Sequence, residues 1–333
     1  MPLRNLGIQL RIIFASLALF FIFNSSMVSA KENIDSWLQK LRIEALNKGI
    51  RKDTFDTAFK GFQPIVRIIE LDRRQPEFTL TFQQYLNKVI PSSRVKRGKK
   101  KYLENKVLMD KIAKKYGIQP RFIMAFWGVE TSFGKHFGGY SVVHSLATLA
   151  FDGRRGKYFR GELFRALRIL NQGHISHDQM KGSWAGAMGN FQFMPSSFEN
   201  FAVDYDGDGK RDIWTNKGDA FASAANYLAK SGWKLNQTWG RAVKLPRNFD
   251  NQLITKKVRK SIKEWQKIGV RGLDGGNLPK QNFLASIVVA RNKKTEKHGK
   301  AYMVYGNYNV TLKWNRSTFF AIAVGMLADR IGS

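Results

Sequence analysis

The sequence predicts a mainly α-helical protein of the α+β class, and two observations support this prediction. Apolar residues recur at helical spacing through most of the chain. One stretch differs, because residues 241–310 combine short apolar runs with Gly- and Lys-rich loops, as strands and their connections do. We therefore expect an N-terminal helical unit at residues 31–115, a helical core formed by residues 116–240 and 311–333, and a small β-containing insertion at residues 241–310.

The individual helices follow from apolar spacing. Residues 34–62 place apolar side chains partly on one face, which predicts an amphipathic helix and a turn. A Pro-Ser-Ser sequence at residues 91–93 indicates a break, and solvated loops are expected at the lysine-rich residues 96–101 and 293–300. Further helices are predicted at residues 102–116, 146–151, 163–170, 220–228 and 319–327.

The insertion is expected to contain three strands and one short helix. Strands are predicted at residues 243–245, 283–290 and 302–305. Trp265 interrupts this pattern within a short segment of helical character.

Residues 1–30 have the layout of a secretory signal peptide. Arg4 and Arg11 precede a short apolar run, and small residues precede the expected cleavage point after Ala30. A retained N-terminal anchor is the alternative. The chain contains no cysteine, which excludes both a disulfide and lipid attachment through a cysteine.

Glu130 is the candidate catalytic residue. It lies at the end of a short apolar helix that begins at Pro120, and it is the only carboxylate between Asp110 and Asp152. Apolar burial and the negative end of the helix dipole both raise the pKa of a carboxyl group, as a general acid requires. The alternative is a solvated carboxylate at a helix end. The uncharged, Gly- and aromatic-rich residues 182–197 suggest acid catalysis on a neutral polymer such as a glycan.

A second carboxylate is harder to find, although most glycosidases use two. Asp152 precedes two arginines and is expected to form an ion pair with an arginine. Glu162 has arginines nearby in a helix, which is a common surface pattern, and Asp178 is expected to be exposed in a loop. None is a compelling partner for Glu130, but Asp152 stays open as the second acid.

Several motifs in order resemble the lytic murein transglycosylase B family of peptidoglycan-cleaving enzymes. This resemblance covers most of the chain after residue 30, and it implies a lysozyme-like helical core around Glu130. The matching segments are residues 128–134 (GVETSFG), 145–151 (SLATLAF), 154–155 (RR), 158–159 (YF), 161–163 (GEL), 182–189 (GSWAGAMG), 192–197 (QFMPSS), 225–228 (ANYL), 232–233 (GW), 314–317 (WNRS) and 321–324 (AIAV).

The resemblance implies a mechanism with one acid. Glu130 would protonate the oxygen of the β-1,4 bond between N-acetylmuramic acid (MurNAc) and N-acetylglucosamine (GlcNAc). It would then act as the base while the muramoyl C6 hydroxyl attacks C1, leaving a 1,6-anhydroMurNAc end. Two alternatives remain: a hydrolytic muramidase that uses Glu130 and Asp152, and a non-catalytic cell-wall-binding protein.

The same resemblance places Ser183, Gln192 and Tyr227 in the substrate groove. Ser183 and Gln192 carry groups that hydrogen-bond acetamido and hydroxyl groups, and Tyr227 could pack on a sugar face. Gln192 could instead satisfy loop backbone groups, and Tyr227 could be a core residue. Trp314 and Asn315 are expected to close the site from the far side.

Four aspartates between residues 204 and 212 have the spacing of an EF-hand-like calcium loop. They occupy positions 1, 3, 5 and 9, and Gly209 provides the glycine at position 6. Carboxylate oxygens on alternate residues converge on one hard cation, so Ca²⁺ is predicted in a structural role; an Asp/Gly-rich solvated turn is the alternative. The four are Asp204, Asp206, Asp208 and Asp212.

The rest of this loop departs from the EF-hand pattern. Lys210 occupies position 7, where the backbone carbonyl is the ligand. Thr215 stands at position 12 in place of the usual bidentate Glu. The resemblance implies that Asp219 closes the loop instead.

The chain carries a formal net charge of +31, and +29 remains without residues 1–30. Such a basic surface favours acidic partners, and a secretory signal makes nucleic acid an unsuitable one. Peptide-stem carboxylates of peptidoglycan and anionic lipid head groups fit better. We expect a monomer in the periplasm of a Gram-negative bacterium, without a stable membrane anchor after signal cleavage. Its expected partners are peptidoglycan glycan strands and proteins of cell-wall synthesis or division.

Overall fold

The structure is a computed structural model that describes residues 33–332 apart from residues 75–79, 293–295 and 297–298. The predicted signal segment, residues 1–30, lies outside the described residues. Within the described part, no helix combines the length and the apolar character that crossing a bilayer requires. Helices dominate and most strands belong to one small sheet, so the predicted mainly α-helical fold is confirmed.

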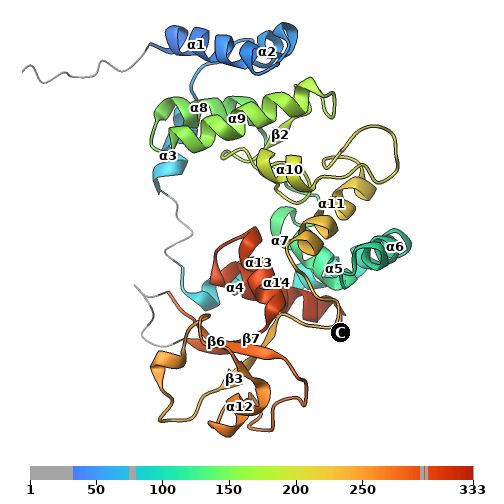
Figure 1. Ribbon diagram of the computed structural model, residues 1–333, viewed down its shortest axis with the longest axis vertical. Coiled ribbons are helices and arrows are strands. Elements are labelled where there is room, and N and C mark those ends of the chain that lie inside the picture. Colours follow the sequence, from blue (N-terminus) through green and yellow to red (C-terminus); the bar gives the residue numbers. More distant parts are fainter. Residues whose placement is uncertain (1–32, 75–79, 293–295, 297–298, 333) are drawn as a thin grey trace, which may run out of the picture.

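The N-terminal helices cover a helical pair at one end of the long axis, as Figure 1 shows. The side chain of Asn33 caps the first helix, which buries Trp37 edge-on against Phe151 with ring centroids 5.5 Å apart. The helix and turn predicted at residues 34–62 are thus present as two short helices. The elements here are α1 (Ile34–Asn47), α2 (Lys52–Ala58), α8 (Val142–Asp152) and α9 (Gly156–Asn171).

The lysine-rich residues 96–101 are helical, so the prediction of a solvated loop there is wrong. They belong to α5 (Ser92–Glu104), which is followed by α6 (Lys106–Tyr116). The inner face of α5 packs on α14 through Gly98, where a Cβ atom would meet Ile331 at 2.6 Å. The contact that orders α5 therefore involves a glycine and a distant part of the chain, which local apolar spacing does not reveal.

The central helix α7 (Pro120–Thr131) is almost entirely buried and packs against α14 (Thr318–Gly332). Proline at its first position costs no hydrogen bond, as the sequence predicted. The helix ends three residues before Gly134, because Ser132 and Phe133 adopt left-handed backbone angles of φ 54° and 62°. This tight end fixes the orientation of the last helical turn, which carries Glu130.

Several other helices complete the core, and one of them, α11 (Lys217–Lys230), corresponds to the helix predicted at residues 220–228. Four described helices were not predicted, because each spans no more than nine residues, which is too short a window for the helical period to stand out. One of these is fixed locally by a capping box between Thr81 and Gln84. The unpredicted helices are α3 (Val66–Arg74), α4 (Phe82–Val89), α10 (Pro195–Phe201) and α13 (Gly306–Trp314).

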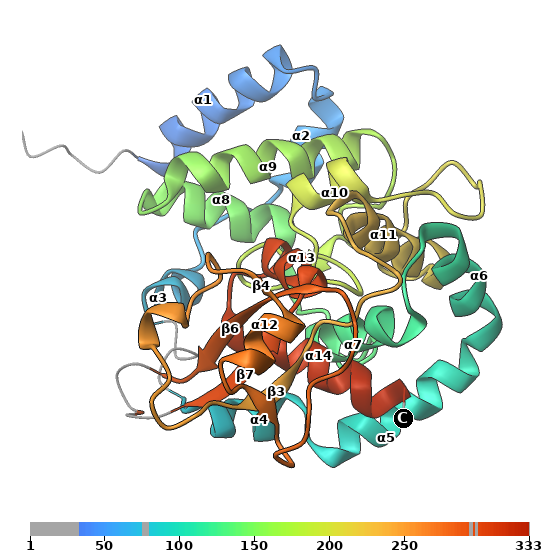
Figure 2. The same ribbon diagram turned by 60° about the horizontal axis from the view of Figure 1, so that its bottom comes forward.

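The main sheet is antiparallel with the strand order β4-β6-β7-β3-β5, and Figure 2 shows it beside α14. Its separate apolar core is centred on Trp265, which lies in a helix as predicted. The three predicted strands are present, and the predicted loop at residues 293–300 lies largely outside the described residues. The elements are β3 (Gly240–Lys244), β4 (Lys260–Ser261), α12 (Ile262–Lys267), β5 (Arg271–Gly272), β6 (Leu284–Ala290) and β7 (Lys300–Val304).

Candidate active site

Glu130 lies in the last turn of α7 with its side chain half-buried. Burial raises the pKa of its carboxyl group to about 8, while a hydrogen bond from Trp314 opposes the rise. In that bond, Nε1 of Trp314 donates to Oε1 of Glu130 at 2.8 Å. The raised pKa predicted from the apolar helix is confirmed, and Glu130 holds its proton at neutral pH.

Trp314 is held in place by an aromatic cluster. Its ring centroid lies 4.6 Å from that of Phe126, 4.6 Å from that of Tyr227 and 5.3 Å from that of Phe193. The hydroxyl of Tyr227 donates to the carbonyl of Lys313 at 2.9 Å. Tyr227 is therefore a largely buried residue that fixes the end of α13, and a direct contact between Tyr227 and a sugar stays a prediction.

Asn315 follows Trp314 at the end of α13 and is exposed. Its Oδ1 accepts a hydrogen bond from the backbone N–H of Ser317 at 3.0 Å. The structure thus places this amide beside the residue that contacts Glu130.

Ser183 and Gln192 both brace the loop between α9 and α10. Oγ of Ser183 accepts hydrogen bonds from the backbone N–H groups of Ala185 and Ala187. Nε2 of Gln192 donates to the carbonyls of Phe137 and Gly189 at 3.1 and 3.2 Å. The amide of Gln192 therefore satisfies loop backbone groups, the alternative left open by the sequence. Within the described chain, Oε1 of Gln192 accepts no hydrogen bond and the hydroxyl of Ser183 donates none.

Asn190 joins this loop to α7 and was not singled out from the sequence. Its Oδ1 accepts a hydrogen bond from Nε1 of Trp127, and its backbone carbonyl accepts one from the hydroxyl of Thr131, both at 2.8 Å. Its Nδ2 donates to the carbonyls of Ile213 and Trp214. One buried amide thus ties α7 to two loops. The sequence shows only that Asn190 is an amide residue within the uncharged segment 182–197, which does not distinguish it from its neighbours.

Tyr85 on α4 is a second residue that the sequence analysis missed. Burial raises the pKa of its hydroxyl to about 12, and the charge of nearby Glu130 adds to the rise. Its ring packs against Phe319 at 5.5 Å. Tyr85 therefore presents a protonated hydroxyl within electrostatic reach of the acid. No local pattern links the two, because they lie on different helices far apart in sequence.

The other carboxylates have separate roles. Asp152 is largely buried and pairs with Arg73 at 2.7 Å, so the expected ion pair with an arginine is confirmed. Glu162 is buried, so the prediction that it lies on the surface is wrong. Its Oε2 accepts a hydrogen bond from the backbone N–H of Ser196 at 2.8 Å, because the first turn of α10 attracts an anion. Asp178 is exposed as predicted. Among the described residues, no second carboxylate contributes to the raised pKa of Glu130.

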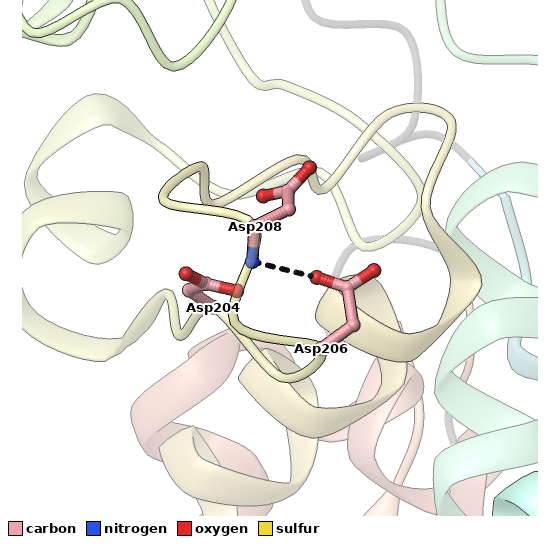
Figure 3. Close-up of side chains that lie close together, drawn as sticks. All are labelled: Asp204, Asp206 and Asp208. Atoms are coloured by element: carbon pink, nitrogen blue, oxygen red, sulfur yellow. Dashed lines mark hydrogen bonds between the residues drawn. The ribbon is translucent and has the colours of Figure 1, made fainter.

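The predicted calcium loop brings three carboxylates together. Oxygen atoms of Asp204, Asp206 and Asp208 lie within 4.8 Å of one another, and Figure 3 shows the three side chains on one loop. Gly207 and Gly209 adopt left-handed φ angles of 81° and 87°, and their N–H groups donate to Asp204. Hard oxygen donors on alternate residues of a tight loop fit a calcium ion.

The remaining loop residues hold the backbone. Asp219 is buried and accepts the N–H groups of Tyr205 and Asp212, each at 2.7 Å. Burial raises the pKa of Asp219 to about 6, and the nearby aspartates add to the rise. The N–H of Lys210 donates to Asp208 at 2.8 Å. The metal-liganding roles of Lys210 and Asp219 stay predictions, because neither belongs to the described three-carboxylate group.

Comparison with known proteins identifies the family. The profile of the family described as "Transglycosylase SLT domain" matches residues 33–329. The chain belongs to this family. The transglycosylase is 32% identical over 257 residues to the membrane-bound lytic murein transglycosylase B of Escherichia coli strain K12. That match covers 74% of the chain and 66% of the relative, so the chain spans about two thirds of the length of that relative.

Solved structures of lytic transglycosylases resemble the transglycosylase over most of its length. SltB3 from Pseudomonas aeruginosa, in complex with NAG-NAM-pentapeptide, has a TM-score of 0.86 and 42% identity, covering 90% of this chain and 79% of that chain. SLT35 from Escherichia coli, in complex with calcium, has a TM-score of 0.74 and 27% identity, covering 89% and 92%. The predicted lysozyme-like fold class and the enzyme class of lytic murein transglycosylase are thereby confirmed.

Proposed function

We propose that this chain cleaves the β-1,4 bond between MurNAc and GlcNAc in peptidoglycan and leaves 1,6-anhydroMurNAc ends. The observation that carries the proposal is Glu130, whose carboxyl pKa is raised to about 8 by burial without help from another described carboxylate. One protonated acid whose pKa is raised by no other described carboxylate suits a reaction in which the same group first gives and then takes a proton.

The first step transfers the proton of Glu130 to the glycosidic oxygen, and the bond from C1 of MurNAc to that oxygen breaks. The N–H of Trp314 stays on Oε1 and stabilises the carboxylate that forms. The carbonyl oxygen of the substrate's own N-acetyl group stabilises the positive charge at C1.

The second step restores the acid. The carboxylate of Glu130 takes the proton from the C6 hydroxyl of MurNAc while that oxygen forms a bond to C1. The proton count balances and no water is consumed, so a second catalytic carboxylate is unnecessary. The pairing of Asp152 with Arg73 supports this route over a two-acid hydrolysis, because Asp152 is already engaged.

Substrate contacts are proposed for five residues around Glu130. Ser183 and Gln192 would present their remaining hydroxyl and carbonyl groups to acetamido and hydroxyl groups of the glycan. Trp314 and Tyr227 would form an aromatic wall at C6 and C1, and Asn315 would hydrogen-bond from the exposed end of α13. SltB3 in complex with NAG-NAM-pentapeptide supports peptidoglycan as the substrate class.

The loop containing Asp204, Asp206 and Asp208 is proposed to bind Ca²⁺ in a structural role, with Lys210 and Asp219 completing the set. The ion would neutralise clustered carboxylates and hold the segment between α10 and α11 in shape. Its support here is the convergence of three carboxylates, together with the calcium complex of SLT35.

Export by residues 1–30 and action as a monomer in the periplasm are part of the same proposal. Proteins of cell-wall synthesis or division remain the proposed partners. The layout of the first thirty residues supports export, and the murein-acting relative from Escherichia coli supports a location at the cell wall.

Mass spectrometry of muropeptides tests the function. Purified sacculi are incubated with residues 31–333, and the released products are analysed. Products one water lighter than reducing-end muropeptides are the expected result. Reducing ends would mean hydrolysis and would return Asp152 to consideration, and no release at all would favour a cell-wall-binding protein.

A further inference from the structure

The helices α5 and α6 form a strongly basic corner of the molecule, which we call the α5–α6 elbow (residues 92–116). Ten of its 25 residues are Lys or Arg, and two are acidic. Residues 244–300 are also basic, with fifteen Lys or Arg and four acidic residues. However, this segment is more than twice as long as the elbow. Positive charge is therefore more concentrated at the elbow.

Packing fixes which side chains of the elbow face solvent. Gly98 is buried against Ile331 and Phe133, where an added Cβ atom would lie 2.6 and 3.0 Å from them. Nη1 of Arg97 donates to Oγ of Ser132 at 2.8 Å and ties α5 to the end of the catalytic helix. On α6, Ile112 is fully buried. Both helices are thus held in a fixed rotation, and their outer faces are fixed with them.

Two branched apolar side chains protrude at the bend of the elbow. Leu103 at the end of α5 is 70% exposed, and Val107 at the start of α6 is 72% exposed. Between them, Asn105 is buried and its Nδ2 donates to the carbonyl of Lys101 at 2.8 Å, which holds the bend. Burial of the polar residue and exposure of the two apolar ones reverse the usual preference.

Exposed lysines flank this apolar pair on both helices. On α5 they precede Leu103 at helical spacing, and on α6 they follow Val107 in the same way, so each set shares a face with its apolar residue. The two acidic side chains of the elbow, Glu104 and Asp110, already pair with Lys101 and Lys106. Figure 2 shows both helices at the outer edge of the molecule. The flanking exposed lysines are Lys96, Lys99, Lys100, Lys111 and Lys114.

We propose that the α5–α6 elbow docks on the surface of a bilayer that contains anionic phospholipids. The lysines would lie against the phosphates, and Leu103 and Val107 would enter the boundary between head groups and acyl chains. A glycan or a peptide stem offers carboxylates but no apolar phase for two aliphatic side chains. The helices lie along the outside of the molecule, which suits a planar surface better than a binding groove (Figure 2). Docking would hold a wall-cleaving enzyme close to its substrate without a spanning helix.

Vesicle co-sedimentation tests this inference. The protein used is residues 31–333, which retain every described element. It is mixed with phosphatidylcholine vesicles that contain either no phosphatidylglycerol or about 30 mol% of it, which gives the vesicles an anionic surface. Binding is expected only to the anionic vesicles and should weaken as salt is raised. Absence of binding to the anionic vesicles at low salt would overturn the proposal.

Two matched pairs of variants assign the binding to the elbow. A quadruple Lys→Gln change at Lys96, Lys100, Lys111 and Lys114 should lower the partition coefficient at least about tenfold, because each lysine near an anionic surface contributes roughly fivefold. The control has the same net charge and removes four exposed lysines of the sheet region: Lys256, Lys257, Lys263 and Lys280.

The apolar pair needs its own control. Leu103→Ser with Val107→Ser should lower vesicle binding about tenfold or more, whereas Leu273→Ser with Leu284→Ser, at other exposed positions, should change it less than about twofold. Circular dichroism and the rate of muropeptide release in solution should stay unchanged in all four variants. Equal losses in the Lys→Gln elbow variant and its control would show attraction by net charge alone, and equal losses in the two serine variants would show that binding does not depend on Leu103 and Val107. Reduced binding to sacculi with unchanged vesicle binding would point to a wall polymer. Each of these results would overturn the proposal.

Discussion

Trp314 donates its indole N–H to Oε1 of Glu130 at 2.8 Å, although 184 residues separate them in the sequence. This bond brings the end of α13 against the last turn of α7. It lowers the pKa of Glu130, whereas burial raises it, and the result is a pKa of about 8. The carboxyl group is thus protonated at neutral pH and has a donor in place for the charge that it acquires when it gives up its proton.

Replacing Trp314 by Phe should separate these two effects. Loss of the N–H leaves burial unopposed, so the pKa of Glu130 should rise by up to about one unit. The alkaline limb of the pH profile of kcat/KM should move upward from about pH 8 by the same amount. The rate at pH 7 should fall roughly tenfold, because the carboxylate formed in the first step loses its donor.

Trp233→Phe is the control for this change. Trp233 is buried, and its Nε1 donates to Oε1 of Gln119 at 2.7 Å, at the opposite end of α7 from Glu130. Both variants should lose some stability, but only Trp314→Phe should shift the pH profile. A shift of equal size in both would mean that it reflects destabilisation rather than the bond to Glu130.

Glu130→Gln should abolish glycan cleavage while the fold, followed by circular dichroism, stays the same. Gln resembles protonated Glu in shape and its carbonyl still accepts from Trp314, but it has no proton to transfer. A loss of at least about a thousandfold is expected, since general acid and base catalysis both depend on this group. The release of anhydro-muropeptides measures it, and turnover close to that of the unaltered protein would contradict the role of Glu130.

The same variant should change how stability depends on pH. The pKa of Glu130 is about 8 in the folded protein and roughly 4.3 in an unfolded chain. Between these values the folded state holds a proton that the unfolded state has lost, so the contribution of this group to stability falls as pH rises. Glu130→Gln lacks this loss. Its melting temperature relative to the unaltered protein should increase from pH 4 to pH 8 and then level off. A constant difference would contradict a raised pKa.

Tyr85→Phe tests the hydroxyl that lies within electrostatic reach of Glu130. With its pKa raised to about 12, this hydroxyl stays protonated at neutral pH and can donate to the substrate. Removal of this hydroxyl should lower kcat/KM roughly tenfold, because the transition state would lose the stabilisation that one hydrogen bond contributes. Tyr302→Phe is the control, because burial also raises the pKa of Tyr302 to about 12 and its hydroxyl lies near Met326. Equal activity of the two variants would remove Tyr85 from the site.

The sequence predicts Glu130 and its helix well because their signals are local. A proline, an uninterrupted apolar run and one isolated acid stand within a few residues of one another, and burial then sets the pKa. The acidic loop is equally local, since its ligand spacing is a property of adjacent residues. The family resemblance adds Trp314, whose bond to Glu130 no local pattern could reveal.

The predictions from sequence fail where contacts between distant parts of the chain determine the structure. The lysine-rich helix is ordered by Gly98 against Ile331, far along the chain. Glu162 has the arginine neighbours of a surface residue, but α10 packs on α9 and buries it. Asn190 and Tyr85 act through groups on other elements. In each case the missing information is which surfaces meet, and spacing within one element does not contain it.

Removal of calcium should lower the melting temperature by several degrees. An ion present at about a hundred times its dissociation constant stabilises the folded state by roughly 2.7 kcal/mol. Each kcal/mol shifts the melting temperature by about 2 °C, the lower end of the range for large domains. A chelator should therefore destabilise the protein, and added Ca²⁺ should restore it.

Asp204→Asn should lower the melting temperature and abolish the response to the chelator, because Asp204 belongs to the carboxylate group. Asp178→Asn, at an exposed aspartate outside this group, should keep the full response. If neither the chelator nor added calcium changes the melting temperature, the calcium proposal is wrong and the loop is an Asp-rich turn held by its own hydrogen bonds.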